Sequence, residues 1–286
     1  MSPELNFNSM SGQLLFSTVR IETVTDTGSG SGTGFIYQVP AGDDQSVPVL
    51  VTNKHVLARA NQIRFFLHEA DHERGVPILG SRLNVAVNID EEGRSWIYEH
   101  PDEDIDIAIA PIAFLLNKIL ADGKFPYYKA IPPEYIPSSD AIADIDAIES
   151  IIMIGYPNGL FDQKNLTPIV RTGAMATPIQ LDYAGLPAFL IDASVFPCSS
   201  GSPVFLYNPT QHRLANGTVV MGSRTFLLGV VAAVHVRQQS MDIREAVATT
   251  QYVQSEEAID LGLVFRSECI EQVVDVLLED RGLAKS

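Results

Sequence analysis

Two blocks of short apolar runs restrict the folds that are open to this chain. The first block ends at residue 112 and the second begins at residue 148, and in both the runs are rich in β-branched and aromatic residues and are separated by Gly, Pro, Asp and Ser. Alternating strand and helix units would need helical stretches between the runs, so the pattern favours a barrel or sandwich. We therefore expect an all-β protein with two β-domains. The runs are 13–24, 33–39, 47–53, 62–68, 82–89, 105–112, 148–157, 168–181, 188–196, 203–207, 225–236 and 259–267.

Two segments depart from this pattern. Residues 113–147 begin with a short helix candidate and continue with a stretch rich in Pro and Tyr, which indicates a linker or insertion. In 267–286, apolar residues recur at helical spacing, which predicts a C-terminal helix that begins after Ser267, ends at Gly282 and packs against the second β-domain. The expected division is 1–112, 113–147, 148–266 and 267–286.

Charge and cysteine usage limit the partners and the compartment. The net charge of −16 opposes tight binding to a phosphate backbone, so we expect no nucleic acid partner. The two cysteines, Cys198 and Cys269, form no disulfide framework, which suits a reducing compartment. The N-terminus lacks a basic segment followed by an apolar run, and no apolar run reaches the length of a bilayer span. The expected location is therefore cytoplasmic, without a membrane partner.

Three side chains occupy positions that suit nucleophilic catalysis. His55 follows the run 47–53 directly, Asp106 opens the apolar stretch DIAIAPI, and Ser200 precedes Gly201 in the turn PCSSGSP. Acyl transfer by a serine needs a hydroxyl, an imidazole that takes its proton, a carboxylate that orients the imidazole, and backbone N–H groups aimed at the oxyanion. Asp104 competes with Asp106 for the carboxylate role.

These residues lie in stretches that resemble the chymotrypsin-like serine peptidases, and most closely the HtrA/Deg-type bacterial branch. Six stretches follow the order typical of that branch, and no PDZ domain follows them. The resemblance implies a double β-barrel, a protein or peptide substrate and no cofactor. It leaves out three probable insertions at 113–147, 212–223 and 238–257. The matching stretches are GTGF (32–35), TNKHV (52–56), DIAI (106–109), IGYPNGL (154–160), DASVFPCSSGSP (192–203) and DLGLVFRS (260–267).

The same resemblance assigns roles within the site. It implies that His55 is the general base, Asp106 its orienting carboxylate and Ser200 the nucleophile, with the backbone N–H groups of Cys198 and Ser200 forming the oxyanion hole. Cys198 stands where the branch usually has Gly, and a side chain there disfavours the backbone orientation that the hole needs. Three hypotheses stay open: an active endopeptidase, an endopeptidase that is latent until a protein partner or a ligand activates it, and a catalytically silent binding module.

The primary specificity pocket follows from spacing within the resemblance. Ser194, six residues before Ser200, takes the place at the pocket base where trypsin-type enzymes hold an acid. Val231, Ala232 and Ala233 would supply the walls, which predicts a modest and mostly apolar pocket.

The segment His68-Glu69-Ala70-Asp71-His72 spells the H-E-x-x-H signature of zinc metallopeptidases. That mechanism needs both imidazoles on one face of a helix. Here the segment follows the strand-like run QIRFFL and precedes Glu73-Arg74-Gly75, so a hairpin turn is the better interpretation. No metal site is expected.

Overall fold

The computed structural model describes residues 5–42, 45–89, 96–244 and 250–283, and within 233–244 and 250–259 it describes the backbone alone. The first half of the chain forms an eight-stranded sheet in the order β5-β4-β1-β2-β3-β7-β6, with β8 paired to β4. Its strands are β1 (Thr18–Thr25), β2 (Gly28–Pro40), β3 (Ser46–Thr52), β4 (Gln62–Asp71), β5 (Val76–Asn88), β6 (Tyr98–Glu99), β7 (Ala108–Pro111) and β8 (Pro126–Tyr127).

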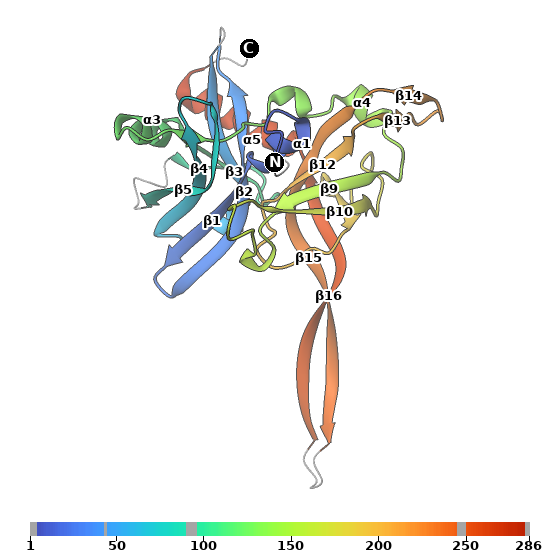
Figure 1. Ribbon diagram of the computed structural model, residues 1–286. Helices are drawn as coiled ribbons and strands as arrows, with labels where there is room; N and C mark the ends of the chain where they lie inside the picture. The colour runs from blue at the N-terminus through green and yellow to red at the C-terminus, as the bar shows by residue number, and fades with distance from the viewer. Residues whose placement is uncertain (1–4, 43–44, 90–95, 245–249, 284–286) are drawn as a thin grey trace.

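The second half forms a closed barrel in the order β10-β11-β16-β15-β12-β9, and it lies beside the first sheet (Figure 1). A separate two-stranded hairpin, β13 paired with β14, lies within the expected insertion 212–223 and just before it. The strands of this half are β9 (Ser150–Gly155), β10 (Ile169–Met175), β11 (Ala188–Asp192), β12 (Pro203–Asn208), β13 (Gln211–Arg213), β14 (Val219–Met221), β15 (Arg224–Arg244) and β16 (Thr250–Arg266).

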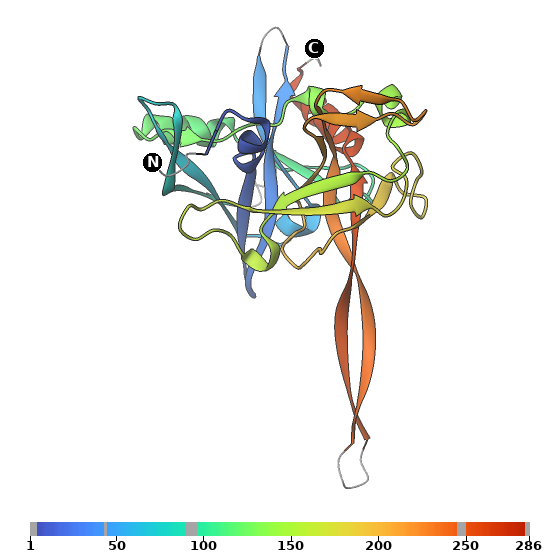
Figure 2. The ribbon, with the colours of Figure 1, turned by 45° about the vertical axis from the view of Figure 1, so that its right-hand side comes forward.

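The strands β15 and β16 are far longer than the barrel requires. Their antiparallel pairing runs from Gly229 opposite Arg266 to Arg244 opposite Thr250, with two register shifts on the way. Beyond the barrel they continue as a two-stranded ribbon that projects away from the body of the molecule (Figures 1 and 2). The described residues of the expected insertion, 238–244 and 250–257, lie in this ribbon.

The helices are short except for the last one. They are α1 (Met10–Leu15), α2 (Lys54–Leu57), α3 (Ala113–Ala121), α4 (Ser139–Ala143) and α5 (Glu268–Arg281), with 3₁₀ turns η2 (Pro133–Tyr135) and η3 (Pro157–Gly159). The predicted helix in the expected linker is therefore α3. Among the described residues, no helix combines the length and apolar character needed to cross a bilayer.

Helix α5 packs between the two halves. Its apolar face, which includes Ile270 and Val273, shares one buried cluster with Tyr37 of the first sheet and Phe205 of the barrel. The expected packing against the second half is confirmed, and the helix also packs against the first half, because an apolar stripe this wide can cover two surfaces. Gly282 ends the helix at φ +62°, as predicted.

Polar contacts confirm that α5 also engages the first half. The Tyr98 hydroxyl donates to Asp280 Oδ2 at 2.6 Å, and His100 Nε2 lies 2.6 Å from Gln272 Oε1. At the start of the helix, Ser267 makes no side-chain capping bond. The predicted all-β class with a C-terminal helix is confirmed, whereas the boundaries at 112 and 148 stay a prediction.

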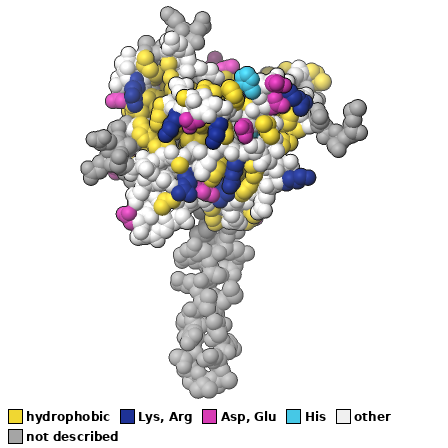
Figure 3. Space-filling model, turned by 60° about the vertical axis from the view of Figure 1, so that its left-hand side comes forward, with side chains coloured by type: hydrophobic (Ala, Val, Ile, Leu, Met, Phe, Trp, Pro, Cys, Tyr) yellow, Lys and Arg dark blue, Asp and Glu magenta, His cyan; other side chains and the backbone are white. Residues whose placement is uncertain are grey.

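The net negative charge does not produce an acidic surface everywhere. On the face shown in Figure 3, Lys and Arg side chains are interspersed with Asp and Glu among apolar and uncharged groups. Mixed charge of this kind keeps a surface solvated without a strong field of one sign.

Candidate functional site

His55 and Asp106 form a hydrogen-bonded pair at one edge of the first sheet. His55 lies on the single turn α2, directly after β3, and Asp106 lies two residues before β7, the strand that pairs with β3. Oδ2 of Asp106 contacts His55 Nδ1, and Oδ1 accepts the backbone N–H of His55 at 3.1 Å. Both carboxylate oxygens therefore fix the same residue, which orients the imidazole with Nε2 as the free ring nitrogen.

Neighbouring side chains hold this pair in place. Nδ2 of Asn53, a fully buried residue, donates to the carbonyl oxygen of Asp106 at 2.5 Å. Asp104 is exposed, and its backbone N–H donates to Asp102 Oδ1 at 2.9 Å. Of the two carboxylates that competed in the sequence, Asp106 is the one that contacts His55.

The turn 196–202 of the second half presents its three serines unequally. Ser199 and Ser202 are fully buried, and their hydroxyls have no hydrogen-bond partner among the described residues. Ser200 is half-buried, and its hydroxyl donates weakly to the carbonyl oxygen of Ala232 at 3.4 Å. Within the described chain, no hydrogen bond joins Ser200 to His55.

Gly201 explains why the turn needs glycine after Ser200. Its φ is +87°, and a Cβ atom placed there would lie 1.9 Å from the carbonyl oxygen of Thr33. The backbone of the turn therefore lies directly against β2, at a distance that only glycine allows.

Cys198 also adopts a left-handed conformation, at φ +68°. This backbone costs a non-glycine residue about 1–2 kcal/mol. Its Sγ accepts a hydrogen bond from Ser31 Oγ at 3.0 Å, and its carbonyl oxygen accepts one from Thr33 Oγ1 at 3.0 Å.

The preceding peptide unit is fixed as well. Asn158 donates its backbone N–H to the carbonyl oxygen of Pro197 at 2.7 Å. In a trans peptide the N–H points opposite to the carbonyl, so the N–H of Cys198 points away from Asn158. The backbone N–H groups of Cys198 and Ser200 make no hydrogen bond among the described residues.

Thr33 joins the two halves at this turn, a role that is not evident from the sequence. Its backbone N–H donates to the carbonyl oxygen of Ser200 at 2.9 Å, in addition to its side-chain bond to Cys198. Its Oγ1 also accepts the backbone N–H of Tyr156 at 3.1 Å. The available signal was the GTGF stretch itself, but a strand threonine does not reveal its partners.

Three of the expected pocket residues, at 231–233, lie inside strand β15, and Ser194 follows strand β11. Ser194 is half-buried, and Ala232 is buried. The side chain of Val231 belongs to the apolar cluster of the barrel interior, so Val231 can border a pocket only through its backbone. The side chain of Ala233 lies outside the described residues.

The H-E-x-x-H segment does not form a helix. His68, Glu69 and Asp71 lie in strand β4, and the chain turns back into β5 after His72. Burial lowers the pKa of His68, and its Nε2 lies 3.0 Å from the carbonyl oxygen of Asn165. No cluster of three or more His, Cys, Asp or Glu suited to a metal ion occurs in the part of the chain that the structure describes.

The sequence matches a family model described as a trypsin-like peptidase domain, over residues 32–215. The chain belongs to this family. The match begins at the GTGF stretch and includes His55, Asp106 and Ser200. No curated protein matches the sequence.

Solved structures of proteases are similar to this chain at low identity. A variant of the HtrA-type protease AlgW with a tripeptide has a TM-score of 0.50 and 15% identity, over 96% of this chain and 64% of that one. A serine endoprotease from Yersinia pestis has a TM-score of 0.48 and 15% identity, over 98% and 69%. A protease from M. tuberculosis in its active form has a TM-score of 0.47 and 16% identity, over 94% of this chain and 83% of that one. This chain thus spans less than two thirds of the AlgW chain, and the likeness shows the fold alone.

Proposed function

We propose that this chain is a serine endopeptidase that works through His55, Asp106 and Ser200. The observation that carries the proposal is the contact of both Asp106 carboxylate oxygens with His55, in a family fold that places a half-buried serine on a glycine turn. The proposed substrate is a protein or peptide, and the proposed location is the cytoplasm.

The proposed reaction begins at the Ser200 hydroxyl. Nε2 of His55 takes the hydroxyl proton while Oγ attacks the scissile carbonyl carbon, and the resulting oxyanion accepts the N–H groups of Cys198 and Ser200. The imidazolium then gives its proton to the leaving amine, and the acyl group stays on Ser200. Water, activated by His55, hydrolyses this ester and restores the serine. Asp106 keeps Nδ1 protonated throughout.

Ser200 supports a further proposal, that the resting enzyme is latent until a protein partner or ligand acts on it. Its hydroxyl points to the Ala232 carbonyl oxygen at 3.4 Å instead of bonding His55. Attack requires a rotation of this side chain towards the imidazole, since proton transfer takes place within hydrogen-bonding reach. A catalytically silent binding module remains the second candidate, favoured by the same observation.

Labelling with a fluorophosphonate tests the proposal. The native chain should be labelled on Ser200, while Ser200→Ala abolishes labelling and His55→Ala slows it strongly. A chelator should leave the rate unchanged, because the proposed mechanism uses no metal. If the native chain is not labelled even when peptides from a denatured protein are added as activators, the endopeptidase proposal fails and the silent binding module is favoured.

A further inference from the structure

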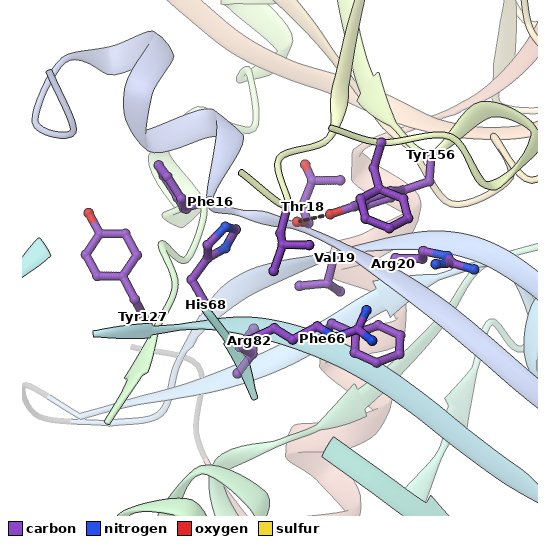
Figure 4. A pocket seen from close by; sticks show the side chains of 12 residues that line it. Phe16, Thr18, Val19, Arg20, Phe66, His68, Arg82, Tyr127 and Tyr156 are labelled. Carbon is purple, nitrogen blue, oxygen red and sulfur yellow. Dashed lines mark hydrogen bonds between the residues drawn. The ribbon is translucent and has the colours of Figure 1, made fainter. Parts of the chain in front are cut away.

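A cavity of about 30 Å³ lies between the two halves of the molecule, apart from His55 and Ser200. It is bounded by strand β1, by the hairpin of β4 and β5, and by the segment 156–166 that follows β9 (Figure 4). A space of this size admits a group of only a few heavy atoms. The walls are mostly apolar and aromatic, which favours a guest with an apolar part, and polar groups contribute at Thr18, Arg20 and Arg82.

Two polar atoms at this cavity lack partners. Thr18 is only 4% exposed, and its Oγ1 makes no hydrogen bond among the described residues. Two residues along β1, on the same face of the strand, Arg20 has its Nε buried and unbonded as well. Buried polar atoms without partners are rare in folded proteins and require an explanation. Both atoms can donate a hydrogen bond to a ligand.

The charge around the cavity is positive. The guanidinium of Arg20 lies over the ring of Phe161 at 5.2 Å, and that of Arg82 lies over Phe66 at 4.8 Å. Glu22 binds Arg20 through Nη2 at 2.8 Å and so leaves Nε available, whereas Arg82 has no ion pair among the described residues. Such an unpaired cation beside unbonded donors favours an anion, in a protein whose net charge is −16.

We propose that this cavity is a binding site for a small carboxylate with a short apolar tail. The carboxylate accepts hydrogen bonds from Thr18 Oγ1 and Arg20 Nε and faces the charge of Arg82, while the tail packs against the aromatic walls. A carboxylate fits better than a neutral amide because all three groups donate hydrogen bonds. The carboxylate can belong to a free acid or to the C-terminus of a peptide.

The site is linked to the turn that carries Ser200, and this part of the inference rests on the proposed function. Phe161 and Leu166 of the segment 156–166 border the cavity. The same segment donates the N–H of Tyr156 to Thr33 and the N–H of Asn158 to Pro197, one residue before Cys198. A ligand that packs against the segment therefore holds the peptide unit that directs the Cys198 N–H.

Calorimetric titration of the full chain with propionate tests the binding site, with propionamide as the neutral analogue and chloride to match ionic strength. Propionate should bind, and propionamide should bind at least about 10-fold more weakly, which is the loss expected for charge-assisted hydrogen bonds. N-acetylglycine distinguishes the two sources, since tighter binding than propionate indicates a peptide C-terminus. Equal binding of propionate and propionamide, or no binding of either, overturns the proposal.

Two variants locate the ligand. Thr18→Val should weaken propionate binding and raise Tm by about 2 °C, because it removes an unbonded buried hydroxyl. Arg82→Gln should weaken binding, whereas Arg74→Gln on the exposed turn of the same hairpin, with the same charge change, should not. Equal weakening by Arg82→Gln and Arg74→Gln contradicts the site.

The labelling rate of Ser200 tests the link between the cavity and the turn that carries Ser200. Saturating propionate should change the rate of fluorophosphonate labelling of the native chain at least about 3-fold, and Arg82→Gln should remove the change. Calorimetric titration of Ser200→Ala with propionate measures binding without any reaction, because this variant lacks the nucleophile. If propionate binds but the labelling rate stays constant, the link is wrong and the binding site stands. Failure of all labelling refutes the endopeptidase proposal alone.

Discussion

The edge that carries His55 and the turn that carries Ser200 are organised in different ways. At the edge, side chains fix the site, since Asp106 contacts His55 twice and Asn53 holds Asp106. At the turn, backbone conformation fixes it, with left-handed residues at Cys198 and Gly201 pressed against Thr33 of the other half.

This difference assigns the placement of the base to one half of the molecule and the placement of the nucleophile to contacts between the halves. The edge belongs to the first sheet and needs no residue of the barrel to place the base. The turn is placed by Thr33 and Asn158, and both are outside it. Changes at the edge should therefore alter the reaction with little effect on stability, whereas changes at the turn should alter both.

The largest effect is expected at the edge. Asp106→Asn should slow fluorophosphonate labelling of Ser200 by about 10⁴-fold, because the imidazole loses the partner that holds its tautomer. The midpoint of urea unfolding should change little, since the side chain keeps its shape. Asp104→Asn, two residues away and not bonded to His55, is the control and should label at the native rate. Equal rates for the two variants would show that Asp106 has no part in the reaction.

Gly201→Ala should disrupt the turn. The added methyl would meet the Thr33 carbonyl oxygen at 1.9 Å and Thr52 Oγ1 at 2.5 Å, in a backbone with φ +87°. We expect a loss of about 3 kcal/mol or more in the free energy of unfolding, measured in urea. Gly217→Ala has a similar φ of +86° with nothing near the added methyl, and should lose about 1 kcal/mol. Equal losses would refute the close approach to β2.

Thr33→Val should weaken the joint between the halves. It removes the bonds to the Cys198 carbonyl and the Tyr156 N–H, which are worth about 2 kcal/mol together. Labelling of Ser200 should slow even under conditions in which the variant is fully folded, and Thr33→Ser should restore it. The control is Thr172→Val, at an exposed residue of strand β10, which should change neither the free energy of unfolding nor the labelling rate. A labelling rate that Thr33→Val leaves unaltered would argue against a positioning role.

The smallest effect is expected at Cys198. Replacement by glycine removes the left-handed strain but adds chain entropy to the unfolded state, so stability should change by less than about 1 kcal/mol. The labelling rate should be equal or higher, and a slower rate would mean that the thiol itself contributes.

Iodoacetamide at pH 8 should modify Cys198 but not Cys269, because burial raises the pKa of the Cys269 thiol to about 12 and leaves a negligible thiolate fraction.

Local patterns in the sequence predicted much of the fold. The β-branched runs predicted the strands, and the positions of His55 and Asp106 beside paired strands brought them together, because β3 and β7 are neighbours. The left-handed Gly201 could be expected from its place after Ser200. These inferences depend only on residues close in the chain or on a resemblance in order.

Contacts between distant segments could not be read in the same way. The apolar stripe of α5 predicts burial but does not name every surface that it covers, so its packing on the first half was missed. Thr18, Arg20 and Thr33 lie in strands with ordinary alternation, and the sequence does not reveal that both threonines are buried. Their partners, or lack of them, depend on the segment 156–166, which is remote in sequence.

The ribbon of β15 and β16 bears on the order in which the barrel folds. Pairs near Arg244 and Thr250 close a short loop, and each pair formed there shortens the loop that the next pair must close. Pairing can therefore advance inward, step by step, to Val231 and Val264 in the barrel wall. The long extension of these two barrel strands thus need not slow folding, because it replaces one contact between distant residues with a series of local pairings.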